Sequence, residues 1–253
     1  MTDTKLNNEL EHRSPDYIAA AAKAALGAVP FAGSLLAELA GSIVPNQRIV
    51  RIVDFARRLE QRLSDTERQL IRARLTDEHF SDLLEESVRQ AAHSVSEERR
   101  ERIASLLRNS LNETALSFLE SRHLLRILGE LNDVEVLRLS SHLFEGFGDG
   151  KEFREQHRAI LEDIATPFNA PESTYERAAM QGSFDEHLAR LGLLNAKHNV
   201  NRKTGHLVID DRTGELEVSG YALLPFGRLF LKQIGVAVDD ERANLRMEPT
   251  RRP

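Results

Sequence analysis

Histidines and carboxylates are the side chains of this sequence that could carry acid–base or metal chemistry. Nine histidines are present, but none falls in an H-E-x-x-H zinc motif, and no G-x-S-x-G nucleophile motif occurs. Five stand singly in predicted helices: His79, His93, His123, His142 and His157. The 40 Asp and Glu residues lie mainly at helix starts and on polar faces. We therefore expect no catalytic residue, no metal site and no cofactor, and interpret the chain as non-enzymatic.

A glycine-rich loop at residues 145–151, EGFGDGK, has the residue types of a phosphate-binding loop. Its two outer glycines are separated by three residues where the motif needs four, and Glu152 replaces the hydroxyl residue. We interpret it as a flexible turn. The absence of cysteine from the sequence excludes a disulfide, a thiolate zinc site and a cysteine nucleophile, and it fits a reducing cytoplasm.

Positive charge is concentrated in a stripe on one flank of the helix predicted to start at Asn46. At 100° per residue the stripe gathers Phe55 and four arginines: Arg48, Arg51, Arg58 and Arg62. These cations could meet anionic lipid headgroups, at about 1 kcal/mol each. The alternative is a solvated helix face whose arginines pair with nearby carboxylates such as Asp54 and Glu60. The net charge of −6 argues against general nucleic-acid binding.

The element that most needs to be shielded from solvent is the charge-poor segment 17–44, YIAAAAKAALGAVPFAGSLLAELAGSIV. Ser14, Pro15 and Asp16 form a helix start, Gly27 and Pro30 end that helix, and a second helix runs to Pro45. The sequence thus predicts a helical hairpin over 14–45. The residues assigned to its membrane or self-association contacts are Gly27, Pro30, Phe31, Gly33, Leu36 and Gly41.

Each arm of this hairpin has about 11 apolar residues, whereas a membrane span needs roughly 20. Three interpretations remain open. The hairpin is a buried, close-packed pair of helices, or it is sheltered at rest and released onto a bilayer or a neighbouring subunit, or it is a constitutive membrane anchor. The N-terminal residues 1–13 are polar and acidic, so they are expected to form a disordered tail rather than a secretory signal.

The middle of the chain has the periodicity of amphipathic helices. The first buries one face made of Ile49, Ile52, Val53, Ala56, Leu59 and Leu63. Capping signals predict further helix starts at Ser64 (a capping box with Glu67), Thr76–Asp77, Ser96, Thr114 and Asp133, and a last helix over 151–164. Predicted core positions are Phe80, Leu83, Leu84, Val88, Ala91, Val95, Ile103, Leu106, Leu107, Leu111, Leu116, Leu119, Leu125, Leu128, Leu137 and Leu143. Short connections favour a compact bundle.

The pattern changes after TPFNAP at residues 166–171, which predicts a domain boundary between a helical domain (14–165) and a C-terminal domain (171–238). The C-terminal domain is expected to contain helices 172–180 and 183–191, strands 206–209 and 215–218, and a helix over 226–234 that Pro225 starts. This order is that of a winged helix. The fold class is therefore mainly α, a helical bundle followed by a small winged-helix-like α+β domain, with a disordered tail over 239–253.

Two stretches carry a family resemblance: HLARLGLL at 187–194 and, after the hairpin, LLPFGRLFLKQI at 223–234. They resemble the recognition helix and the Leu-Thr-Pro-x-Gly-Arg ending of winged-helix proteins, especially bacterial proteins related to the abortive-infection alpha family. Those proteins often begin with an Ala/Gly-rich segment similar to GAVPFAG at 27–33. The resemblance covers both ends of the chain, and Leu224 stands where threonine is usual. The layout also resembles, in topology alone, the four-helix cell-death modules of immunity.

A winged helix that reads DNA needs cations on its second helix. Here that helix offers Asp185, Glu186, His187 and Arg190. The wing carries Arg202, Lys203 and Arg212, which are offset by Asp210, Asp211, Glu215 and Glu217. The sequence favours a wing used for protein contact or self-association over a DNA reader or a structural cap.

These observations lead to one hypothesis and one alternative. The hypothesis is a cytoplasmic bacterial defence or stress effector or adaptor, whose hairpin acts on a membrane or in self-association and whose winged helix binds a protein. Its partners would be a protein or a second copy of the chain, and an anionic membrane on activation, with peripheral localisation there. Nucleic acid is less favoured, and no small-molecule substrate is indicated. The alternative is a winged-helix transcription regulator with a helical dimerisation domain.

Overall fold

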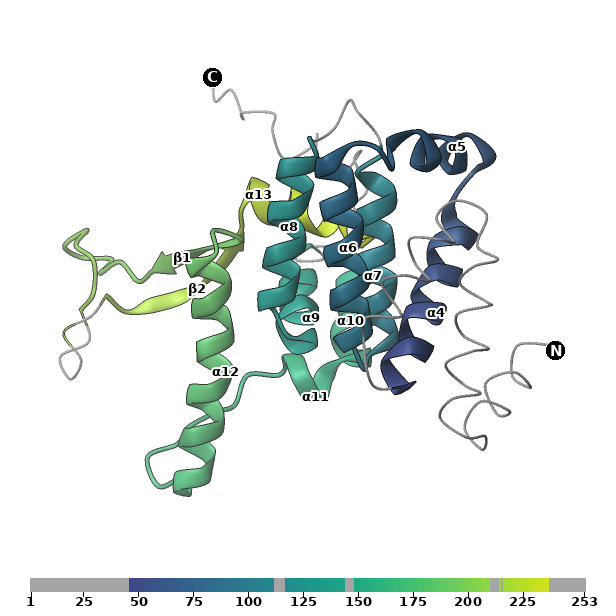
Figure 1. Ribbon diagram of the computed structural model, residues 1–253. Helices are drawn as coiled ribbons and strands as arrows, with labels where there is room; N and C mark the ends of the chain where they lie inside the picture. Colours follow the sequence, from purple (N-terminus) through teal and green to yellow (C-terminus); the bar gives the residue numbers. More distant parts are fainter. Residues whose placement is uncertain (1–45, 112–116, 144–147, 210–213, 215, 237–253) are drawn as a thin grey trace. The chain divides into compact units, whose positions relative to one another are not determined.

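The computed structural model describes residues 46–111, 117–143, 148–209, 214 and 216–236 (Figure 1). Within them the chain is mainly helical, with a two-stranded antiparallel sheet near the C-terminus, which confirms the predicted helical bundle and small α+β domain. The predicted hairpin 14–45 and its six assigned residues lie outside the described residues, as do Arg212 and both predicted tails. The chain divides into two compact units between Glu130 and Leu131.

Unit 1 is a bundle of helices joined by short connections. Its helices are α4 (Asn46–Arg62), α5 (Asp65–Arg74), α6 (Glu78–His93), α7 (Glu97–Asn109) and α8 (Phe118–Glu130). Helix α4 packs against α6 and α7, and α8 packs against the same two helices (Figure 1). The predicted apolar face of α4 is buried along its whole length, from Ile49 to Leu63. Burial of each large aliphatic side chain contributes about 1.5–3 kcal/mol, so this face holds the bundle together.

The helix starts of unit 1 follow the predicted capping signals. Ser64 and Glu67 form the reciprocal capping box, because the Glu67 amide donates to Ser64 Oγ (3.3 Å) and the Ser64 amide donates to the Glu67 carboxylate (2.7 Å). Asp77 caps α6 and Ser96 caps α7, as expected. The predicted core positions from Phe80 to Ala91 and from Ile103 to Leu111 are buried.

Two predicted core positions of unit 1 are wrong. Val95 is 77% exposed, because α6 ends at His93 and Val95 stands in the connection to α7. Leu119 is 60% exposed. Helix α8 begins at Phe118 rather than at Thr114, since the Glu120 amide donates to Ser117 Oγ and the Ser117 amide donates back to the Glu120 carboxylate. Leu125 and Leu128 are buried as predicted, and Leu116 lies outside the described residues.

Unit 2 contains short helices, one long helix and the sheet. Its elements are α9 (Asp133–Ser141), α10 (Gly148–Gln156), α11 (Arg158–Leu161), α12 (Glu172–Arg190), β1 (Leu194–His198), β2 (Val218–Leu223) and α13 (Pro225–Gln233). Helix α9 contacts α10, α11 and α12, and α12 contacts β1. These contacts join residues on both sides of the segment 166–171, at which the sequence predicts a boundary. The observed division therefore comes earlier in the chain.

Three predicted elements of unit 2 differ from the structure. Asn132, not Asp133, caps α9, and Val136 and Leu139 are its buried apolar residues, whereas Leu137 and Leu143 are partly exposed. The helix expected over 151–164 is divided at His157. The two helices expected over 172–180 and 183–191 are the single helix α12, because a lone glycine such as Gly182 costs a helix only about 1 kcal/mol.

The predicted β-hairpin of the C-terminal domain is larger than expected. The bridge between Ile209 and Leu216 confirms the pairing of the two predicted strands. The main ladder lies outside them, where β1 pairs antiparallel with β2 from Leu194↔Leu223 to His198↔Val218. The strand β1 was missed because LNAKH alternates weakly between apolar and polar residues.

The last helix starts as predicted. Pro225 is its first residue, and Leu224 at the cap position makes no side-chain capping bond. The Leu224 amide donates instead to the carbonyl of Leu193 (3.0 Å), just before β1. This bond ties the start of α13 to the end of the α12–β1 connection.

Membrane crossing needs about 20 residues of continuous apolar helix. Among the described residues, none of the helices combines the length and the apolar character that such a span requires.

Candidate interaction surfaces

The basic stripe of α4 is engaged by carboxylates in unit 1. Arg58 forms ion pairs with Asp54 (2.8 Å) on its own helix and with Glu97 (2.9 Å) and Glu101 (3.2 Å) on α7. Arg62 also pairs with Glu101, and Arg51 donates to the carbonyl of Ala92 (3.3 Å). The stripe therefore links α4 to α6 and α7. Asp54 could be predicted as a partner, but Glu97 and Glu101 lie about 40 residues away, and no local pattern points to them.

The Asp54 carboxylate also binds a second arginine, Arg100, which lies on α7. Arg100 is buried, and its Nε donates to Asp54 while its Nη1 donates to the carbonyls of Ser94 (2.9 Å) and Val95 (3.0 Å). Burial opposes ionisation of Asp54, but the hydrogen bonds and charges of Arg58 and Arg100 outweigh it and hold its pKa below the ordinary value. Phe55, which the sequence places within the stripe, is fully buried.

Acidification is expected to destabilise unit 1 through Asp54. Because its folded-state pKa lies below the ordinary 3.8, the carboxylate stabilises the fold above that value, and this contribution disappears as the pH falls through the folded-state pKa. In urea unfolding of the full chain from about pH 7 to about pH 2, stability should fall more steeply below about pH 4 in the wild type than in Asp54→Asn. The exposed Glu130→Gln serves as control. Equal slopes in wild type and Asp54→Asn would contradict this role.

In unit 2, charged side chains fasten the C-terminal half of α12 to α9. Arg138 of α9 forms a two-point ion pair with Asp185 of α12, with distances of 2.9 Å and 2.5 Å, and both residues are buried. Burial disfavours the charged guanidinium, but Asp185 more than compensates and raises the pKa of Arg138. Two residues further along α12, His187 Nδ1 lies 2.6 Å from the buried carboxylate of Glu135. The predicted recognition-helix residues Asp185 and His187 thus contact α9.

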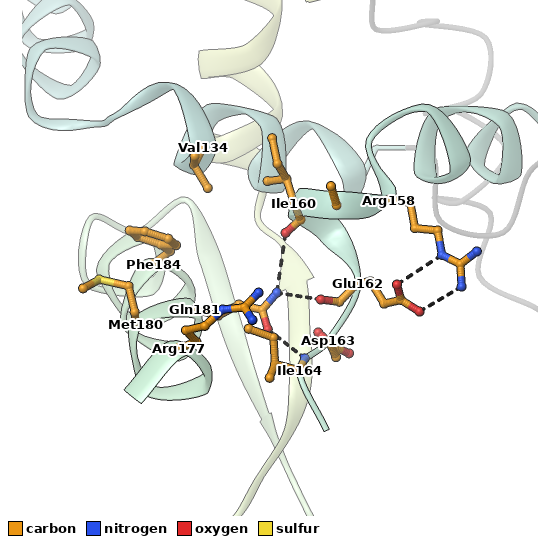
Figure 2. Close-up of a pocket in the computed structure, with 11 residues that line it drawn as sticks. Val134, Arg158, Ile160, Glu162, Asp163, Ile164, Arg177, Met180, Gln181 and Phe184 are labelled. Carbon is orange, nitrogen blue, oxygen red and sulfur yellow. Dashed lines mark hydrogen bonds and ion pairs between the residues drawn. The ribbon is translucent and has the colours of Figure 1, made fainter. Parts of the chain in front are cut away.

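The N-terminal half of α12 is exposed and borders a groove of about 630 Å³ (Figure 2). Apolar side chains of Val134, Ile160, Met180 and Phe184 line it, and Met180 is 61% exposed. Gln181 fixes one wall, because its amide donates to the carbonyls of Ile160 (3.5 Å) and Glu162 (2.9 Å) and accepts from the Ile164 amide (3.1 Å). Such a groove can receive an apolar side chain of a partner.

The loop that leads into α12 also carries an exposed apolar side chain. Phe168 is 96% exposed, and Tyr175 is partly exposed while its hydroxyl donates to the carbonyl of Pro167 (2.8 Å). Sequence reasoning assigned these residues to a domain linker and a helix, and their exposure could not be predicted from that assignment. Large apolar side chains exposed close together mark interaction sites.

A second, polar pocket of about 550 Å³ lies beside the Arg138–Asp185 pair. It is lined by Arg154, Asp163, Lys197 and Tyr221 among others, so it gathers both signs of charge. Burial, together with the charges of Asp185 and Glu186, raises the pKa of the Tyr221 phenol. Within the described part of the chain, no group of three or more histidines and carboxylates is placed to hold a metal ion.

Arg202 and Lys203, which the sequence assigns to a wing, lie exposed in a turn. Asn201 Oδ1 accepts from the amides of Lys203 (2.9 Å) and Thr204 (3.3 Å), and Gly205 follows with a positive φ of 72°. This turn presents both cations to solvent. It belongs to a short hairpin closed by the bridge Val200↔Leu207.

Comparisons with known proteins give no assignment, since no family model, curated protein or solved structure matches the chain.

Proposed function

We propose that the chain is a non-enzymatic bacterial defence or stress effector or adaptor. In this proposal the apolar segment 17–44 acts on a membrane or in self-association, and unit 2 is a winged-helix-like protein-interaction module. The order of α12, the β1–β2 hairpin and α13 supports the module, as does the resemblance of its sequence to winged-helix proteins of the abortive-infection type. The small residues of 17–44 support close helix contacts.

The observation that carries the proposal is the engagement of α12 by α9. A DNA-reading helix must present its side chains to the major groove. In unit 2, Asp185 is buried against Arg138 and His187 binds Glu135, so these two side chains of α12 are engaged within the unit. The exposed apolar residues of unit 2, including Phe168 and Met180, suit a protein partner better than a phosphate backbone.

The ion pairs of α4 bear on the membrane part of the proposal. Arg58 and Arg62 are neutralised by Glu97 and Glu101, so they offer little free charge to an anionic bilayer. Membrane binding, where it occurs, should therefore depend on the segment 17–44 rather than on the stripe.

Vesicle flotation tests this dependence. The full chain should float with anionic vesicles, whereas a chain beginning at Asn46 should not, because it lacks the apolar segment. Ala25→Asp and Gly33→Leu should abolish flotation and any toxicity on expression, since one places a charge in the apolar segment and the other blocks close helix approach. Ala179→Asp, on the exposed face of α12, is the matched control and should float like the wild type.

The transcription-regulator alternative is favoured by one observation, the exposure of Arg202 and Lys203 in the wing turn. Gel-shift assays with genomic fragments separate the two functions. Under our proposal no specific complex forms. A salt-sensitive specific complex that is lost in Arg202→Ala/Lys203→Ala, together with wild-type behaviour of Ala25→Asp and Gly33→Leu, would replace our proposal with the regulator.

A further inference from the structure

The polar pocket of unit 2, of about 550 Å³, has an excess of positive charge. Residues of α9, α10, α12, β1 and β2 line it, so the pocket is built within unit 2. With His142 counted as neutral, its charged residues are Arg138, Arg154, Lys197, Asp163 and Asp185. Three cations therefore stand against two carboxylates. A concave lining with this balance attracts an anionic ligand, and the volume is in the range of small-molecule sites.

Arg138 supplies unused hydrogen-bond donors to this pocket. A guanidinium has five N–H groups. Arg138 donates two of them to Asp185 and one to the carbonyl of Ile160 (3.4 Å), which leaves two without an acceptor among the described residues. The residue is only 7% exposed. Because a buried donor without an acceptor costs stability, an acceptor oxygen placed in the pocket would bind there favourably.

Tyr221 adds another unused donor. It lines the same pocket, and its hydroxyl has no hydrogen-bond partner among the described residues. Burial, together with the charges of Asp185 and Glu186, raises the pKa of the phenol, so it stays protonated and able to donate at neutral pH. Arg138 is close enough for its charge to act on this pKa in the opposite direction, so the two donors are neighbours.

The number of donors indicates a phosphate group as their acceptor. A phosphate monoester carries three strong acceptor oxygens, and the planar fork of an arginine matches two of them. A carboxylate offers two oxygens in one plane, which is fewer than these donors can use. Asp163 can only accept hydrogen bonds while it is ionised, so hydroxyl groups on the rest of the ligand suit it.

We propose that this pocket binds the phosphate monoester of a small polyhydroxylated molecule, such as a sugar phosphate. Arg138, Arg154 and Tyr221 hold the phosphate, and Asp163 accepts hydrogen bonds from hydroxyl groups of the sugar. The inference goes beyond the proposed function, because it adds a soluble ligand to a unit for which the sequence indicates no small molecule.

Calorimetric titration of the full chain with glucose 6-phosphate tests the site. At about pH 7 and constant ionic strength, the wild type should bind with a dissociation constant of about 1 mM or lower. Glucose, which lacks the phosphate, should bind at least about tenfold more weakly. Glucuronate, which carries a carboxylate instead of the phosphate, should also bind more weakly than glucose 6-phosphate, because it offers fewer acceptor oxygens to the donors.

Variants of the lining locate the binding. Tyr221→Phe removes one hydroxyl and Arg154→Ala removes one cation, and each should weaken binding about tenfold, because a hydrogen bond to a charged group is lost. Arg158→Ala, four residues further along the chain and outside this lining, is the matched control and should bind like the wild type. Asp163→Asn should bind inorganic phosphate more tightly, since it removes an opposing charge, whereas a merely structural defect would weaken binding.

Four outcomes overturn this site. The first is no saturable binding up to about 20 mM glucose 6-phosphate. The second is equal affinity in the wild type, Tyr221→Phe and Arg154→Ala, and the third is tighter binding of glucuronate than of glucose 6-phosphate. The fourth is a loss of vesicle flotation in Tyr221→Phe, which would assign the phosphate to a lipid headgroup and make the soluble ligand wrong. The first three leave the proposed function untouched, because flotation of Ala25→Asp and Gly33→Leu tests it separately.

Discussion

Replacing Asp185 with asparagine is expected to lower the free energy of unfolding of unit 2 by about 3–5 kcal/mol. The variant leaves the buried guanidinium of Arg138 without its two-point carboxylate partner, and a buried uncompensated charge is among the costliest defects in a folded protein. Urea unfolding of the full chain measures the loss. Amide hydrogen exchange should place it in α9 and α12, the two helices that the pair joins.

Two further variants distinguish the ion pair from general sensitivity of unit 2. Arg138→Met/Asp185→Leu removes both charges and should recover most of the lost stability, since a buried pair can be replaced by apolar residues at little cost. Arg158→Ala breaks an exposed pair with Glu162 and should change stability little. If Asp185→Asn unfolds at the wild-type urea concentration, the pair does not hold α12 to α9.

Gly227→Ala is expected to destabilise the C-terminal part of unit 2 by about 1–3 kcal/mol or more. A Cβ on Gly227 would lie 2.3 Å from the carbonyl oxygen of Leu193 and 2.8 Å from Leu223 Cδ1. The carbonyl oxygen of Leu193 already accepts a hydrogen bond from the Leu224 amide, so it cannot move aside without breaking that bond. Helix α13 would have to shift, which amide exchange of 225–233 should detect as lost protection.

Gly182→Ala is the matched control for that substitution. Gly182 also lies within a helix, α12, but an added Cβ there meets no atom within 4 Å. Alanine has the higher helix propensity, so this change should stabilise the chain by about 0.5–1 kcal/mol. Equal effects of the two substitutions would show that the close approach at Gly227 does not constrain α13.

The accuracy of sequence reasoning depended on how far apart the interacting residues are. Helix starts at Ser64, Asp77, Ser96 and Pro225 were predicted correctly, because each rests on a bond or a ring within a few residues. The buried face of α4 was predicted because period and burial coincide in an amphipathic helix. Val95 was misassigned by extending that period beyond the end of α6. Leu119 lies within α8, but on its exposed side.

Contacts between residues far apart along the chain could not be predicted from the sequence. Arg138 and Asp185 are 47 residues apart, and each resembles an ordinary polar helix residue until the two helices are packed together. The same holds for Arg58 with Glu97. The close approach at Gly227 offered a signal, since it stands in the Pro-x-Gly-Arg motif, but the sequence does not show which backbone atom it faces. The shared face of Leu207, Ile209, Leu216 and Val218 could have been predicted from the sequence, since both of their strands and the pairing of those strands were predicted.

The carboxylate of Asp54 joins three helices through one side chain. It stands near the middle of α4 and holds that helix, through Arg100, to the backbone where α6 turns into α7. Loss of this one carboxylate should therefore loosen the junction of all three helices together, and not α4 alone.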